Sequence, residues 1–235
     1  MDIIVLNVSP YKEKDAILLA LNKNILDSYL VKGIYSQKGT NLALATPLNI
    51  VDIALREGKY KYPVVSESKL IYSPYGSGDD LNVYASLSLI AEACRSLLDD
   101  KDKLILADEL KKTIYSFKEK KIDPVLVALL FLAKAMKCNG YEFTTSHCVE
   151  CDRKDNIVAF SFTEGGFLCQ EHLQNINDAK FTRDELLLIH FVLSSKTLTN
   201  YPSFKRENGL NVLNAMARFI DEYLGVKLKS VSLFL

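Results

Sequence analysis

Up to about Pro74, the apolar residues of this chain fall into short runs that glycines and prolines separate. Short apolar or alternating runs with a turn about every eight to twelve residues are typical of a small β-barrel. We expect five or six strands in this part of the chain. The runs that predict them are residues 3–6, 16–21, 28–31, 42–46, 50–55 and 69–72.

The pattern changes after residues 73–80, where breaker and flexible residues (Ser-Pro-Tyr-Gly-Ser-Gly-Asp-Asp) indicate a linker. Beyond it, apolar residues recur every three or four positions, which predicts amphipathic helices. Two such faces come first, one over residues 84–98 and one over residues 106–117. We therefore expect an α+β, multi-domain chain, with a barrel domain at residues 1–78 and a helical domain at residues 79–235.

Several helix boundaries are marked by local sequence. Asp123 followed by Pro124 predicts a helix start, and Asn139-Gly140 predicts its end. Thr182-x-x-Glu185 forms a capping box ahead of another apolar periodic run. A last helix is expected from about Leu210 to Leu224, with Gly225 as its stop.

A cysteine and histidine pattern interrupts the helical part at about residues 146–174. Cys148 and Cys151 form a Cys-x2-Cys pair, and Cys169 and His172 form a Cys-x2-His pair after seventeen intervening residues. Two close pairs at this separation are typical of a tetrahedral zinc site. Four protein ligands leave no position for water, so we expect one structural Zn²⁺. His147, which adjoins Cys148, is the alternative fourth ligand.

Charge and cysteine content narrow the functional classes. Twenty-nine Lys and Arg balance twenty-nine Asp and Glu, so a protein that grips phosphates would have to concentrate its positive charge locally. An odd number of cysteines (five) favours a reducing cytosol over a disulfide framework. Cys94 and Cys138 lie in helical patterns and are expected to be buried thiols. The longest nearly apolar run, residues 125–135, is too short to span a bilayer.

Sequence signals for catalysis are missing. The chain has no GxSxG, P-loop or HExxH motif. His190 sits in a predicted helix without an accompanying nucleophile motif, so we expect it at the edge of the core or on the surface. We predict no catalytic residues.

The barrel has a basic and aromatic set that could hold single-stranded nucleic acid, although the same residue types also populate ordinary sheet surfaces. These residues are Lys32, Tyr35, Lys38, Arg56, Lys59 and Lys61, with Tyr60 and Tyr62 among them.

Segments spread along almost the whole chain resemble the bacterial recombination mediator family RecO. The segments are Val31-Lys-Gly33, Gly140-Tyr141, Cys148-Val-Glu-Cys151, Phe160-Ser-Phe162, Gly165-Gly-Phe-Leu-Cys169 and Tyr223-Leu-Gly225 with Lys229-Ser230. The resemblance implies an OB-fold barrel followed by a helical domain with a zinc module. It also implies a non-enzymatic, cytoplasmic, nucleoid-associated protein.

The same resemblance implies binding of single- and double-stranded DNA and annealing of complementary strands. The implied protein partners are RecR, the acidic C-terminal tail of single-stranded DNA-binding protein (SSB) and, indirectly, RecA. The chain departs from the family pattern at His172, where many relatives have Cys, and in the loop 34–38, which is less basic. Fewer phosphate contacts predict weaker and less salt-dependent DNA binding.

Two other classes of function stay open from sequence. One is a general RNA-binding or protein-assembly module with a structural zinc, which would prefer single-stranded RNA to DNA. The other is a zinc-dependent hydrolase, which would keep one metal position open to water.

Overall fold

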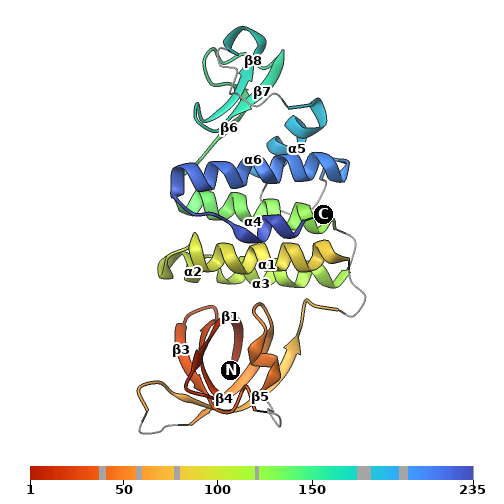
Figure 1. Cartoon of the computed structure of the whole chain (residues 1–235). Coiled ribbons are helices and arrows are strands. Elements are labelled where there is room, and N and C mark those ends of the chain that lie inside the picture. The colour runs from red at the N-terminus through yellow and green to blue at the C-terminus, as the bar shows by residue number, and fades with distance from the viewer. Residues whose placement is uncertain are drawn as a thin grey trace. The chain divides into compact units, whose positions relative to one another are not determined.

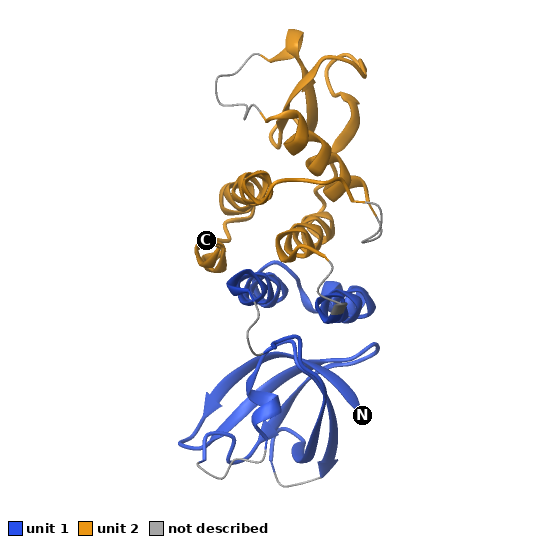
Figure 2. Ribbon diagram, turned by 90° about the vertical axis from the view of Figure 1, so that its right-hand side faces the viewer, with its two compact units in different colours: residues 1–121 blue, residues 122–235 orange. Residues whose placement is uncertain are grey.

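The computed structural model describes residues 1–36, 41–56, 60–76, 80–119, 122–173, 181–195 and 201–234. The chain divides into two compact units, residues 1–121 and residues 122–235 (Figure 2). The predicted boundary between residues 78 and 79 stays a prediction, and residues 77–79 of the predicted linker lie outside the described residues.

The first unit begins with a closed barrel (Figure 1). Its strands are β1 (Asp2–Tyr11), β2 (Asp15–Leu21), β3 (Leu26–Val31), β4 (Ile50–Arg56) and β5 (Val64–Tyr72). They follow one another around the barrel in the order β1-β2-β3-β5-β4. All neighbours are antiparallel except β3 and β5, which pair in parallel at Leu30 and Val64. A closed five-stranded barrel confirms the predicted OB-type architecture.

One of the six strand-like runs was interpreted wrongly. Residues Leu42–Ala45 form a 3₁₀ helix (η1), not a strand. The run alternates like a strand, but Leu44 is buried in the barrel core and its neighbours Ala43 and Ala45 also pack against that core, while Leu42 is 66% exposed. The last strand also begins at Val64, earlier than the predicted residue 69. Residues 66–69 are all charged or polar, so the pattern of apolar residues does not indicate that the strand begins before them.

Three helices complete the first unit: α1 (Leu81–Ser96), α2 (Asp100–Ile105) and α3 (Ala107–Ser116), followed by a 3₁₀ turn η2 (Phe117–Glu119). Aspartates cap the first two, since Asp80 accepts from the backbone of Asn82 and Asp99 from that of Asp102. Aromatic contacts attach these helices to the barrel. The ring of Tyr72 at the end of β5 stacks on Tyr115 of α3, with centroids 4.8 Å apart.

The second unit combines long helices with a small sheet. The helices are α4 (Pro124–Cys138), α5 (Arg183–Ser194) and α6 (Arg206–Leu224), and a 3₁₀ helix η4 (Lys229–Leu233) follows. The sheet has the order β6-β8-β7 and consists of β6 (Thr144–Cys148), β7 (Ile157–Ser161) and β8 (Gly166–Cys169). A short 3₁₀ helix, η3 (Gln170–His172), continues β8.

Most predicted helix boundaries of this unit are confirmed. Asp123 caps α4, the capping box of Thr182 and Glu185 is present in α5, and Gly225 ends α6 at φ +66°. Helix α6, however, begins at Arg206 and not near Leu210. Its first turn has no side-chain cap that the sequence could have indicated.

The two cysteines outside the cysteine and histidine pattern differ. Cys94 is buried, as predicted, and burial raises the pKa of its thiol to about 12. Cys138 is only half-buried at the end of α4, where the helix meets solvent, so the prediction of a buried thiol was wrong there. Among the described helices, none is both long and apolar enough to cross a membrane.

Candidate metal centre and nucleic-acid interface

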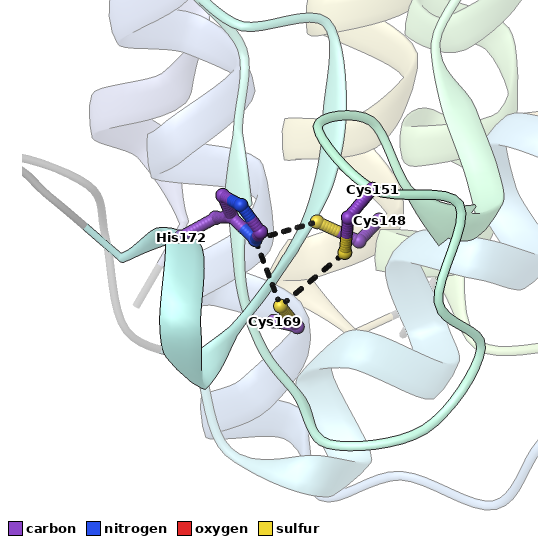
Figure 3. A group of neighbouring side chains, drawn as sticks. All are labelled: Cys148, Cys151, Cys169 and His172. Carbon is purple, nitrogen blue, oxygen red and sulfur yellow. Dashed lines mark hydrogen bonds between the residues drawn. The ribbon is translucent and has the colours of Figure 1, made fainter.

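Three short elements bring the four predicted metal ligands together. Strand β6 ends at Cys148, and the tight turn after it carries Cys151. Strand β8 ends at Cys169, and η3 then turns His172 back toward the cysteines (Figure 3). The parallel pairing of β6 with β8 sets the two ligand pairs side by side.

The side-chain geometry fits a tetrahedral metal ion. The ligand atoms of the four residues all lie within 4.8 Å of one another. The sulfurs of Cys151 and Cys169 are 3.9 Å apart, and Nδ1 of His172 lies 4.0 Å from Cys148 Sγ and 3.2 Å from Cys169 Sγ. Ligands placed about 2.3 Å from a shared tetrahedral centre are roughly 3.8 Å apart. The cluster could therefore hold a metal ion through four protein atoms.

Backbone hydrogen bonds shape the loops that carry these ligands. The Cys148 amide donates to the Arg153 carbonyl at 2.8 Å, and the Asp152 amide donates to the Cys148 carbonyl at 3.0 Å. The guanidinium of Arg153 pairs with Glu171, which joins the first loop to the second. Desolvation raises the pKa of the Cys169 thiol, but the backbone amides of Glu171 and His172 and the neighbouring thiols outweigh it and lower the pKa. A lowered pKa favours the thiolate that binds metal.

The other two histidines lie outside this cluster. His147, the alternative ligand, contacts Ser146 Oγ through Nδ1 at 2.8 Å, and its Nε2 lies 3.3 Å from the Asp152 carboxylate. Nδ1 of His190 lies 2.8 Å from the carbonyl oxygen of Thr145, so this side chain links α5 to β6. His190 is exposed, which agrees with the predicted position at the edge of the core or on the surface.

The predicted nucleic-acid residues that the structure describes lie at the ends of barrel strands. Lys32 follows β3, Arg56 ends β4, and Lys61 precedes β5. Tyr35 is 49% exposed in the turn after β3. Lys38 and Lys59 lie outside the described residues. That these residues bind nucleic acid stays a prediction.

Tyr60 belongs to the basic and aromatic cluster that the sequence indicates, whereas Lys12 does not. The ammonium of Lys32 lies 4.1 Å from the ring centroid of Tyr60 and donates a hydrogen bond to its phenol oxygen. The hydrogen bond and charge of Lys32, together with the charges of Lys12 and Arg56, lower the pKa of the Tyr60 phenol. Lys12 lies in the turn between β1 and β2, far from residue 60 in sequence, so no local pattern could have joined them.

The second unit contains a groove that no sequence pattern indicated. It has a volume of about 810 Å³ and runs along α5, α6 and the segment after α6. Apolar side chains from Phe181, Leu228 and Val231 line it, and Arg218 and Lys227 add positive charge. Glu185 and Asp221 also reach it, but the carboxylate of Glu185 already accepts hydrogen bonds from Thr182 and Asn211.

Known proteins resemble this chain in sequence along most of its length. Residues 78–232 match the family model described as "Recombination protein O C terminal". The chain is similar to "DNA repair protein RecO" of Caldanaerobacter subterraneus subsp. tengcongensis, with 24% identity over 96% of this chain and 91% of the relative. The protein of the same name from Bacillus cytotoxicus is 28% identical over 71% of this chain and 68% of the relative. That of Caldicellulosiruptor bescii is 29% identical over 72% and 69%.

Proposed function

The chain belongs to the RecO family of DNA repair proteins, and from this premise we propose that it is a recombination mediator that works by binding and not by catalysis. It binds single- and double-stranded DNA and anneals complementary strands. With RecR it helps to load RecA onto strands coated with SSB. The observation that carries this proposal is the family match over residues 78–232, joined to an OB-type barrel with a basic and aromatic end.

The barrel is the DNA-binding part in this proposal. Strands and loops at one end of OB folds bind oligonucleotides through a basic surface and stacked aromatic rings. Lys32, Arg56 and Lys61 supply charge here, and Tyr35 supplies an exposed ring. Lys38 and Lys59, which the sequence predicts as DNA-binding residues, complete the proposed set.

The metal in this proposal is zinc, and its role is structural. Cys148, Cys151, Cys169 and His172 are the soft ligand types that zinc prefers. A bound zinc would supply folding energy to a module whose sheet has only three short strands. In this role the metal does not contact a substrate.

The groove along α5 and α6 is the proposed site for the SSB tail. A short acidic peptide with apolar residues at its end needs an apolar groove flanked by positive charge. Phe181 and Leu228 supply the apolar surface, and Arg218 and Lys227 supply the charge. RecR and, indirectly, RecA are the remaining proposed partners, which places the protein with DNA in the cytoplasm.

One experiment tests the whole proposal. Complementary oligonucleotides are coated with the cognate SSB and annealed with and without this protein. Faster annealing supports both DNA handling and SSB engagement. Unchanged annealing, even with RecR added, contradicts the proposal. Competition between single-stranded RNA and DNA in the same assay would reveal an RNA-binding protein instead.

A further inference from the structure

At one end of the barrel, Lys32 holds the aromatic ring of Tyr60 in place. Tyr60 lies between β4 and β5 and is 48% exposed. The Lys32 ammonium lies 4.1 Å from its ring centroid and also donates to its phenol oxygen. A cation–π contact combined with a hydrogen bond restricts the ring before any ligand arrives. A restricted ring loses less conformational entropy when a ligand stacks on it.

Positive charge reaches this ring from three separate parts of the barrel. Lys32 follows β3, Arg56 ends β4, and Lys12 lies in the turn between β1 and β2. Their charges together lower the pKa of the Tyr60 phenol, with Lys32 contributing most. Lys12 lies in the turn between β1 and β2, and Tyr60 lies in the segment between β4 and β5. In OB folds these two loops border the oligonucleotide-binding face.

Unpaired and paired strands use such a surface differently. In a duplex, each base is already stacked and paired, so only phosphates reach the protein. In a single strand, a base can lie on an exposed aromatic ring while its phosphates meet nearby cations. An exposed ring with the Lys32 ammonium against it therefore offers more to an unpaired strand than to a duplex.

We propose that Tyr60 makes the barrel prefer unpaired strands, by stacking one base on its ring while Lys12, Lys32 and Arg56 hold the neighbouring phosphates. This inference rests on the proposed function, because it assumes that the barrel binds DNA. It adds Lys12 to the residues that the sequence indicated and assigns strand selection to Tyr60. The remaining cations contribute affinity that is shared by both forms of DNA.

The test compares three fluorescent probes of one sequence: a single strand, its duplex and a single strand with abasic sites throughout. Binding to the full chain is measured by anisotropy at low salt. Stacking of one base predicts that Tyr60→Leu weakens binding of the normal single strand by roughly 5- to 150-fold. The same variant keeps its affinity for the duplex and for the abasic strand. Tyr60→Phe retains the ring and keeps most of its single-strand affinity.

Two control variants separate stacking from charge and from general damage. Lys12→Met removes one phosphate contact, so it weakens all three probes by a similar factor and lowers the salt slope by about one. Tyr223→Leu removes a tyrosine of similar exposure from α6 (42% against 48%) and leaves all three affinities unchanged. Circular dichroism verifies that each variant is folded.

The outcomes distinguish this inference from the proposed function. If Tyr60→Leu weakens the single strand and the duplex equally, or neither, the inference is wrong and DNA binding by the barrel survives. If Tyr60→Phe loses as much as Tyr60→Leu, the phenol oxygen matters and stacking does not. If the unmodified protein binds none of the three probes, the proposed function itself fails.

Discussion

The rings of Phe162 and Phe219 stack with their centroids 5.0 Å apart and 24° between their planes. Phe162 immediately follows β7, and Phe219 lies in the C-terminal half of α6. Phe219 also contacts Phe143 edge-on at 5.6 Å and stacks on Tyr223 at 4.6 Å. This aromatic cluster attaches the sheet that carries the metal ligands to the helix that lines the groove.

Replacement of Phe219 by Ala is expected to destabilise the second unit strongly. The side chain is only 4% exposed, and its loss leaves a cavity among four aromatic rings. Large-to-small core changes of this kind cost about 3 to 5 kcal/mol. Denaturant unfolding measures the change in free energy. Leu187→Ala on α5, where the side chain is 47% exposed, is the control, and a similar loss in both variants would contradict the cluster's role.

Metal analysis of protein purified without chelator is expected to find one zinc per chain. Cys169→Ser removes a ligand that lies within reach of both Cys151 and His172. It is expected to lose the metal and to lower stability, because metal binding supplies folding energy. Cys138→Ser changes a cysteine outside the cluster and retains the metal. Equal metal content in the two variants would refute the ligand assignment.

Gly166 occupies a position where strand β8 approaches β6 too closely for any side chain. A Cβ atom there would lie 2.2 Å from the Thr144 carbonyl oxygen and 2.7 Å from Cγ1 of Val149. Gly166→Ala must therefore push the strands apart, at a cost of about 3 kcal/mol or more. Thermal unfolding and metal content report the damage.

Gly140→Ala is the matched control for this substitution. A Cβ atom at residue 140 meets nothing within 4 Å, and only its φ of +86° opposes the change. That backbone strain is worth about 1 to 2 kcal/mol. An equal or greater loss in Gly140→Ala would show that the strand contact is unimportant.

The proposed SSB-tail groove predicts a charge effect on peptide binding. Arg218→Glu reverses one of the positive charges that line the groove and is expected to weaken binding of an SSB tail peptide at least about tenfold. Titration of labelled peptide at two salt concentrations measures this loss. Lys154→Glu makes the same charge change at an exposed position between β6 and β7. Equal weakening by both variants would indicate attraction by net charge and exclude a specific groove.

Half-buried Tyr75 predicts a loss of stability at high pH. Burial raises the pKa of this phenol from 10.0 to about 12. Because the raised pKa belongs to the folded state, its contribution is complete below pH 10 and is lost between about pH 10 and 12. The shift corresponds to about 2 to 3 kcal/mol.

Tyr75→Phe is expected to flatten this part of the stability curve measured by denaturant unfolding. The stability of this variant still falls from about pH 9 upward, because the pKa of the Cys94 thiol is also raised in the folded state. An unchanged curve in Tyr75→Phe would refute the assignment.

Features that depend on neighbouring residues were predictable from the sequence. Neighbouring residues alone indicate the capping box of Thr182 and Glu185, the start of α4 at Pro124 and the stop at Gly225. They are local because a cap satisfies backbone groups within three or four residues. The spacing of the two ligand pairs is local in the same sense, because each pair lies within one tight turn. Periodicity likewise indicated the barrel and the helical character of the rest, although it failed at residues 42–45.

Features that join distant residues were decided only by the tertiary structure. His147 and His172 were both candidate fourth ligands, and the pairing of β6 with β8 brings His172 to the cysteines while His147 contacts Ser146 and Asp152. The contact of Lys32 with Tyr60 depends on the order of strands around the barrel. The groove beside Arg218 arises from three separate segments. A local sequence determines the hydrogen bonds and the periodicity of a few neighbouring residues. The contacts named here depend instead on which apolar faces, far apart in the sequence, pack against each other.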